Sequence, residues 1–194
     1  LCCKIGISCF RGHELDLLDR HYRCAEEYKA NVVLKIPSDC PLIDSEIIDG
    51  VIEKFLTSKS DYTSNLHPPS FPDGVDVEVF SFDALKNAWI NAKKDYEREH
   101  TTPYIWDNPD KFKISNFEWE TGLNFSETHR LTLDYEEDYL FIRKVFSTLY
   151  NRNYDFKLKD ILKLLDEEKD LMEINKMHVG VHWYSNHLDD LKTK

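Results

Sequence analysis

The sequence predicts an α/β fold in which a mostly parallel sheet is flanked by helices. Short β-branched or aliphatic runs alternate along the chain with longer stretches whose apolar residues recur every three or four positions. The 194 residues are 41% hydrophobic and 31% charged, which is typical of a globular protein. A chain of this length is most simply one domain, which we assign to residues 1–177, followed by a C-terminal tail at 178–194.

Six segments are predicted to be strands. Residues 32–36 are β-branched and aliphatic, so we expect a buried strand there. In the segment 75–81, Val75, Val77 and Val79 alternate with polar or aromatic residues, which predicts one apolar face and one acidic face. The predicted strands are 5–10, 32–36, 61–65, 75–81, 112–117 and, as the last central strand, 131–133.

Six helices are predicted from the spacing of apolar residues. For example, Ile47, Val51 and Phe55 share one face, and Asp44 or Ser45 caps the start of that helix. The loop 67–74 contains three prolines, which cannot continue a helix or a sheet. The predicted helices are 14–29, 45–57, 82–96, one that begins within 97–104, 136–150 and 158–166.

Charge and cysteine content exclude some classes of protein. The net charge of −11 argues against a nucleic-acid partner, because such proteins usually carry a basic patch. The apolar runs are much shorter than the ~20 residues that span a bilayer, so we expect no membrane segment. The five cysteines are odd in number and form no C-x-x-C pair, which favours a reducing cytoplasm over a disulfide scaffold.

Two acidic residues follow predicted strands. Asp39 lies three residues beyond 32–36, and Asp134 directly follows 131–133. Ligands of open α/β sheets bind just beyond the carboxyl ends of strands. Magnesium takes few protein carboxylates and completes its shell with phosphate and water, so these acids suit Mg²⁺ on a phosphorylated substrate. Alternatively, each acid caps the helix that follows, a role that fits Asp138 better than Asp134.

Four motifs occur in one order along the chain: SDCPLID at 38–44, FPDGVDVEVF at 71–80, EREHTTPY at 97–104 and LTLDYEED at 131–138. Together they resemble the cytidylyltransferase family of spore-coat polysaccharide biosynthesis protein F. That family is related to the synthetases that make CMP-Kdo and CMP-sialic acid. The resemblance covers residues 5 to 175.

The resemblance implies a Rossmann-like nucleotide-diphospho-sugar transferase fold. It also implies a Mg²⁺-dependent transfer of a cytidylyl group from CTP to a sugar acid or related sugar in surface polysaccharide biosynthesis, with release of pyrophosphate. Family members open with a strand and an R-x-G-S-x-R-x-P-x-K loop that cradles the CTP phosphates, and no such segment occurs here. The start, 1–10, resembles the end of the second helix and the third strand, so we expect an N-terminally truncated form of the fold.

The resemblance also assigns roles to individual residues. Asp39 and Asp134 are the predicted catalytic and metal-binding residues. The acids in the second motif offer oxygens to sugar hydroxyl groups, a glycine allows close approach of the backbone to the ligand, and arginine can contact an anion in bidentate geometry. The predicted substrate-binding residues are Ser38, Asp73, Gly74, Asp76, Glu78, Arg98, His100 and Arg130.

Less specific interpretations remain open for several of these residues. In these alternatives, Asp73 and Gly74 simply form a turn and contact no ligand. Likewise, Glu78 points to water, and Arg130 is a surface cation beside acids. In the family, the helix beginning in 97–104 lies at a dimer contact, from which we expect a homodimer.

The tail carries His178, His182 and His187 in an H-x3-H-x4-H spacing that suits zinc. We expect instead that the tail docks on the domain or on a second subunit. For the whole chain, the alternatives to cytidylyl transfer are the use of another nucleotide, and a non-catalytic scaffold or regulatory domain that has lost triphosphate binding.

Overall fold

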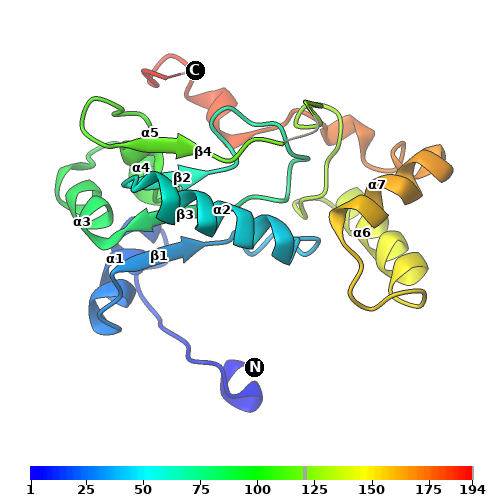
Figure 1. Ribbon diagram of the computed structural model, residues 1–194, viewed down its shortest axis with the longest axis horizontal. Coiled ribbons are helices and arrows are strands. Elements are labelled where there is room, and N and C mark those ends of the chain that lie inside the picture. Colours follow the sequence, from blue (N-terminus) through cyan, green and yellow to red (C-terminus); the bar gives the residue numbers. More distant parts are fainter. Residues whose placement is uncertain (120–121, 194) are drawn as a thin grey trace.

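The computed structural model describes residues 1–119 and 122–193, which form an α/β domain with an open, four-stranded sheet (Figure 1). The strand order across this sheet is β1-β3-β2-β4. The strands are β1 (Val32–Lys35), β2 (Tyr62–Ser64), β3 (Glu78–Ser81) and β4 (Ile114–Asn116).

Strand β3 runs against its neighbours. It pairs antiparallel with both β1 and β2, whereas β2 and β4 pair in parallel. The α/β class is therefore confirmed, and β1, β2 and β4 run in one direction, as predicted for a mostly parallel sheet. The reversed strand β3, which lies between β1 and β2, was not predicted. As a consequence, the start of β3 lies beside the end of β1, where Glu78 is opposite Lys35.

Helices cover both faces of the sheet. One hydrophobic cluster contains Val75, Val77 and Val79 together with α2, and the other contains Phe80 together with α1, α3 and α5. The predicted alternation along 75–81 is thereby confirmed. The covering helices are α1 (Leu17–Glu27), α2 (Ser45–Ser58), α3 (Phe82–Asn91), α4 (Asp95–Glu99) and α5 (Pro103–Trp106).

Two further helices, α6 (Glu136–Leu149) and α7 (Leu158–Glu167), form a pair beyond one end of the sheet (Figure 1). They join the core of α2 through Asp44. This carboxylate accepts a hydrogen bond from Glu46 N at 2.8 Å, which caps α2, and another from Leu158 N at 2.7 Å. Short 3₁₀ turns occupy Cys2–Ile5, Lys169–Leu171, Lys176–His178 and Trp183–Asn186.

Two predicted strands differ from the structure near the N-terminus. Residues 5–10 form no strand: a 3₁₀ turn ends at Ile5, and Ile7 is 59% exposed. Strand β1 is present but not buried, since Val32 and Leu34 are 45% and 40% exposed. The reason is that β1 pairs only with β3 among the described residues and so forms an edge of the sheet.

Later segments also differ from the sequence prediction. The predicted helix 82–96 is interrupted because Ala92 is extended (ψ 128°), so α3 and α4 are separate helices. The predicted helix of 97–104 is divided between α4 and α5 at Thr101, whose φ is +72°. Residues 131–133 are not a strand of the sheet, and an isolated parallel bridge between Asp73 and Arg130 is the only pairing in their vicinity among the described residues.

All five cysteines are free thiols. Within the described part of the chain, no helix combines the length and the apolar character needed to cross a bilayer.

Candidate active site

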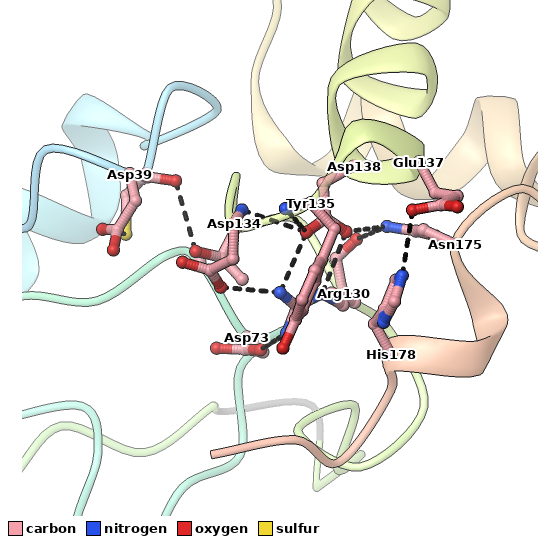
Figure 2. A network of polar contacts seen from close by, with 12 residues as sticks. Asp39, Asp73, Arg130, Asp134, Tyr135, Glu137, Asp138, Asn175 and His178 are labelled. Carbon is pink, nitrogen blue, oxygen red and sulfur yellow. Dashed lines mark hydrogen bonds and ion pairs between the residues drawn. The ribbon is translucent and has the colours of Figure 1, made fainter. Parts of the chain in front are cut away.

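The loop after β1 and the segment before α6 are hydrogen-bonded to each other. The main-chain oxygen of Asp39 accepts a hydrogen bond from Leu133 N at 2.9 Å and one from Thr132 Oγ1 at 3.3 Å. Figure 2 shows Asp39 and Asp134 on the two sides of this junction. The structure thus brings together the two acids that the sequence placed at strand ends, although they are almost a hundred residues apart.

Arg130 is the centre of an ion-pair network that includes Asp134 (Figure 2). Its Nε and Nη2 atoms each lie 2.9 Å from an oxygen of Asp138, in bidentate geometry. Nη2 also donates to Asp134 Oδ2 at 2.6 Å, and Nη1 donates to Asp73 Oδ2 at 3.3 Å. Because Arg130 is only 3% exposed, the interpretation of it as a surface cation is wrong. Its contacts hold Asp73 and Asp134 in place.

Asp138 has a structural role. Its Oδ2 accepts hydrogen bonds from Asp134 N and Tyr135 N at 3.0 and 3.1 Å, which caps the start of α6. Burial favours its neutral form, but hydrogen bonds from Arg130 and Asn175 hold the pKa of Asp138 below its ordinary value. Asp134, by contrast, keeps a side chain that is 46% exposed, so it is the acid of this pair that a ligand can reach.

Asp39 and Asp134 are the residues here that could hold a magnesium ion bound to a phosphorylated substrate. Asp39 and Asp134 provide carboxylates from two facing segments, and magnesium usually takes one or two carboxylates plus phosphate and water. Among residues 1–119 and 122–193, no group of three or more His, Cys, Asp or Glu side chains is arranged to hold a metal. A metal bound here would therefore need further oxygens from substrate or water.

Gly74 allows two segments of backbone to pack closely. Its φ is +97°, and a Cβ at this position would lie 2.3 Å from Thr132 N. The neighbouring residue Asp73 accepts a hydrogen bond from Leu131 N at 2.6 Å and donates one to His129 O at 3.0 Å. The close approach is thus to the chain's own backbone, and it places Asp73 beside the Arg130 network.

Glu78 is buried in the interior instead of pointing to water. It is 2% exposed, forms an ion pair with Lys35, and accepts a hydrogen bond from Tyr62 OH at 2.6 Å. Burial favours its neutral form, but Lys35 keeps the pKa of Glu78 below its ordinary value. Asp76 has no such cation in contact. Burial and the charges of Asp73 and Glu78 raise the pKa of Asp76 to about 7.

The other three predicted substrate-binding residues lie at different places, and only two of them are near the site. Ser38 is exposed in the loop next to Asp39. His100 stacks on Trp183, with ring centroids 3.9 Å apart, and burial lowers the pKa of His100. Arg98 is separate from the acids: it forms hydrogen bonds to Asp16 at 2.9 and 2.6 Å and to Trp89 O at 2.8 Å, which tie α4 to α1 and α3.

The tail packs on the domain, as expected for one of the two docking modes. Asp107 Oδ1 accepts hydrogen bonds from Lys192 N and Thr193 N, both at 2.7 Å. The histidines of the H-x3-H-x4-H spacing diverge, and their ring contacts are with different partners in the described chain. The pairs are His178 with Tyr135, His182 with Tyr184, and His187 with Tyr96.

Sequence reasoning missed Lys35 as a partner of Glu78. A cation at the end of an aliphatic strand was a signal, but only the register of β1 against β3 reveals what it contacts. A hollow of about 190 Å³ lies apart from all the predicted site residues, between α7 and the end of α6. It is lined by Leu149, Arg152, Asn153, Phe156, Asp160, Lys163, Leu164 and Glu167.

Comparison with known proteins agrees with this fold. A family model described as cytidylyltransferase matches residues 1–180. The chain is 39% identical over 178 residues to the uncharacterized protein MJ1063 of Methanocaldococcus jannaschii, covering 90% of this chain and 70% of that protein. It is 31% identical over 170 residues to the spore coat polysaccharide biosynthesis protein SpsF of Bacillus subtilis, covering 87% and 69%.

A solved structure gives the same result. The structure of a cytidylyltransferase from Leptospira borgpetersenii superimposes with a TM-score of 0.81 and 31% sequence identity, covering 88% of this chain and 71% of that chain. These matches confirm the resemblance seen in the four motifs and the nucleotidyltransferase class. The chain belongs to the cytidylyltransferase family.

Proposed function

We propose that this protein transfers a cytidylyl group from CTP to a hydroxyl group of a sugar and releases pyrophosphate, in the biosynthesis of a surface polysaccharide. Family membership gives nucleotidyl transfer as the general reaction, and the similarity to SpsF supports the pathway. One observation carries the assignment of the site: the hydrogen bonds from Thr132 and Leu133 to Asp39 O, which bring together the segments that carry Asp39 and Asp134.

The proposed chemistry depends on positioning and charge. The sugar oxygen must be placed in line with the α-phosphate, while cations hold the charge that develops on the phosphate oxygens. When bound, Mg²⁺ would supply this charge and orient the triphosphate. Asp39 and Asp134 would hold the ion, Arg130 keeps Asp134 oriented, and Asp73 and Asp76 would accept hydrogen bonds from the acceptor.

The replacement Asp39→Asn tests the metal site. We expect it to lower the turnover number about a hundredfold or more, because a neutral amide holds magnesium poorly. Pyrophosphate release with CTP, Mg²⁺ and a panel of sugars measures this effect. The unfolding temperature should change little, since the Asp39 side chain is partly exposed and accepts only a 3.6 Å contact from the Cys40 thiol among the described residues.

Asp49→Asn, on the exposed face of α2, is the matched control and should retain full activity. A second readout is binding: CTP at about 100 times its dissociation constant should stabilise the wild type by about 2.7 kcal/mol, only with Mg²⁺. A folded, fully active Asp39→Asn protein would exclude the metal role. A wild type that neither binds CTP nor releases pyrophosphate would exclude the proposed function in favour of a non-catalytic domain.

A further inference from the structure

The tail crosses the site as a segment that is fixed at both ends. Where it begins, Asn175 Nδ2 donates to Asp138 Oδ1 at 2.9 Å, and the His178 ring stacks on Tyr135 with centroids 3.9 Å apart. Where it ends, Asp107 accepts the two main-chain hydrogen bonds described above, and Leu191 is buried in the hydrophobic cluster that contains Phe80. The residues between these anchors are thus held against the domain.

Three consecutive side chains of the tail, at 182–184, form ring contacts, and one of them lies over the predicted substrate-binding residue His100. Trp183 stacks on His100 at 3.9 Å with an interplanar angle of 20°. His182 and Tyr184 stack on each other, with centroids 4.8 Å apart and an interplanar angle of 12°. Trp183 also contacts the Tyr184 ring in a T-shaped arrangement, with centroids 5.9 Å apart.

The His182–Tyr184 pair lies close to the acids of the site. Burial and the negative charges of Glu127, Asp73 and Asp76 raise the pKa of Tyr184 to about 12. His182 Nε2 is 3.7 Å from Glu127 Oε1, too far for a hydrogen bond, and is a buried polar atom with no hydrogen-bond partner in the described chain. Leaving such an atom unpaired costs free energy, and a bound ligand that pairs with it recovers that cost.

The family match ends at residue 180, so His182 and Tyr184 lie outside the region that the chain shares with the family model. We propose that these two residues determine which acceptor sugar is used, by contacting its hydroxyl groups opposite Asp73 and Asp76. This inference rests on the proposed function. Carboxylates accept hydrogen bonds, whereas the tyrosine hydroxyl and the imidazole can also donate, so together they complement neighbouring hydroxyl groups on a sugar ring.

The replacement Tyr184→Phe tests this inference, because it removes the hydroxyl and keeps the ring that stacks on His182. We expect the KM for the acceptor to rise about tenfold, equivalent to about 1.4 kcal/mol, while the KM for CTP stays within about twofold. The measurement is pyrophosphate release by the full chain. Tyr154→Phe is the matched control, since Tyr154 is 80% exposed, and it should leave both constants unchanged.

Acceptors that lack one hydroxyl group identify the contact. The wild type should use poorly the deoxy sugar that lacks the hydroxyl group contacted by Tyr184. With this sugar, Tyr184→Phe should cause no further loss of activity, because the contact between the two hydroxyl groups is already absent. A tail residue that acts only in folding would lower activity equally with every acceptor. His182→Gln provides a second variant with the same expectation, should Tyr184→Phe unfold at a lower temperature.

The outcomes separate this inference from the proposed function. If the wild type transfers cytidylyl groups and both variants keep its acceptor KM and acceptor preference, the inference is wrong and the proposed function stands. If the wild type transfers to no sugar, the proposed function is wrong and the inference is lost with it.

Discussion

The carboxyl groups of Asp76 and Glu78, near the start of β3, differ in their tendency to ionise because their immediate neighbours differ. Glu78 contacts Lys35 and Tyr62, so the pKa of Glu78 is below its ordinary value. Asp76 is partly exposed and forms no ion pair in the described chain, and burial together with the charges of Asp73 and Glu78 raises its pKa to about 7. The sequence identified these residues as acids on one strand face, but it gave no information about neighbours contributed by distant segments.

We expect Asp76 to make folding stability depend on pH. Because its pKa is raised from 3.8 to about 7, the folded protein retains a proton that the unfolded chain releases. The stabilising contribution is therefore complete below about pH 4 and is lost as the pH rises through 7. Between pH 5 and 8, the free energy of unfolding should fall by more than about 1 kcal/mol relative to Asp76→Asn.

Urea unfolding of both proteins at several pH values, with EDTA present, measures this difference. Asp76→Asn carries no titrating group at this position, so the pH dependence of its free energy of unfolding is due to all the other titrating residues. Parallel curves for the two proteins would show that Asp76 is ionised in the folded state throughout this range.

At the scale of elements, helices were predicted better than strands. The helices of 45–57, 136–150 and 158–166 were confirmed because periodicity reports their buried faces directly. The role of Asp44 as a cap of the following helix was predicted, but the hydrogen bond that its second carboxylate oxygen accepts from Leu158 N was not, because Leu158 is distant in the sequence. Residues 131–133 have the composition of a strand, yet their backbone contacts the loop containing Gly74 instead of the sheet.

Gly74→Ala should destabilise the protein by about 3 kcal/mol or more, since the new Cβ would clash with the backbone of Leu131 and Thr132 in addition to the strain of a positive φ. Gly6→Ala is the matched control: Gly6 has a similar φ of +73° but nothing within 4 Å of an added Cβ, so its cost should be about 1 kcal/mol. Chemical denaturation measures both values. Equal losses in the free energy of unfolding for the two variants would show that the close contact of residue 74 with residues 131–132 does not contribute to the cost of the Gly74 replacement.

At the scale of the whole molecule, the open edge of the sheet at β1 carries exposed apolar side chains. Strand β1 has β3 as its one strand partner in the described structure, and Val32, Leu34 and Ile36 are 45%, 40% and 36% exposed. An edge strand of this kind presents unpaired backbone groups next to apolar side chains, which favours pairing with another strand.

Leu34→Lys should therefore reduce concentration-dependent self-association of the isolated chain, because a charge on an edge strand opposes pairing between edges. Sedimentation velocity over a range of protein concentrations measures the effect. Leu56→Lys, at a position on α2 that is 62% exposed, controls for the added charge. If both variants associate as the wild type does, the β1 edge is not the surface involved.

The arrangement of the strands is what the sequence predicted least well. Alternation along 75–81 predicted the apolar face of β3 correctly, because side-chain period reflects burial. The predicted acidic face is also buried, since Phe80 belongs to the second hydrophobic cluster. The alternation contains no information on strand direction, so the antiparallel pairing of β3 was not foreseen. The approach of the segments that carry Asp39 and Asp134 was anticipated, since each acid follows an apolar run. The contacts of Arg130 and of the tail depend on folding of the complete domain.

The anchoring of the tail at Asp107 has an evolutionary consequence. The tail contributes few residues to the two hydrophobic clusters, so most of its side chains can be replaced while the sheet and helices keep their packing. If the two proposals hold, descendants of one ancestral enzyme can diversify in their preferred sugar by changes near the C-terminus, while the acids proposed to bind the metal are inherited unaltered.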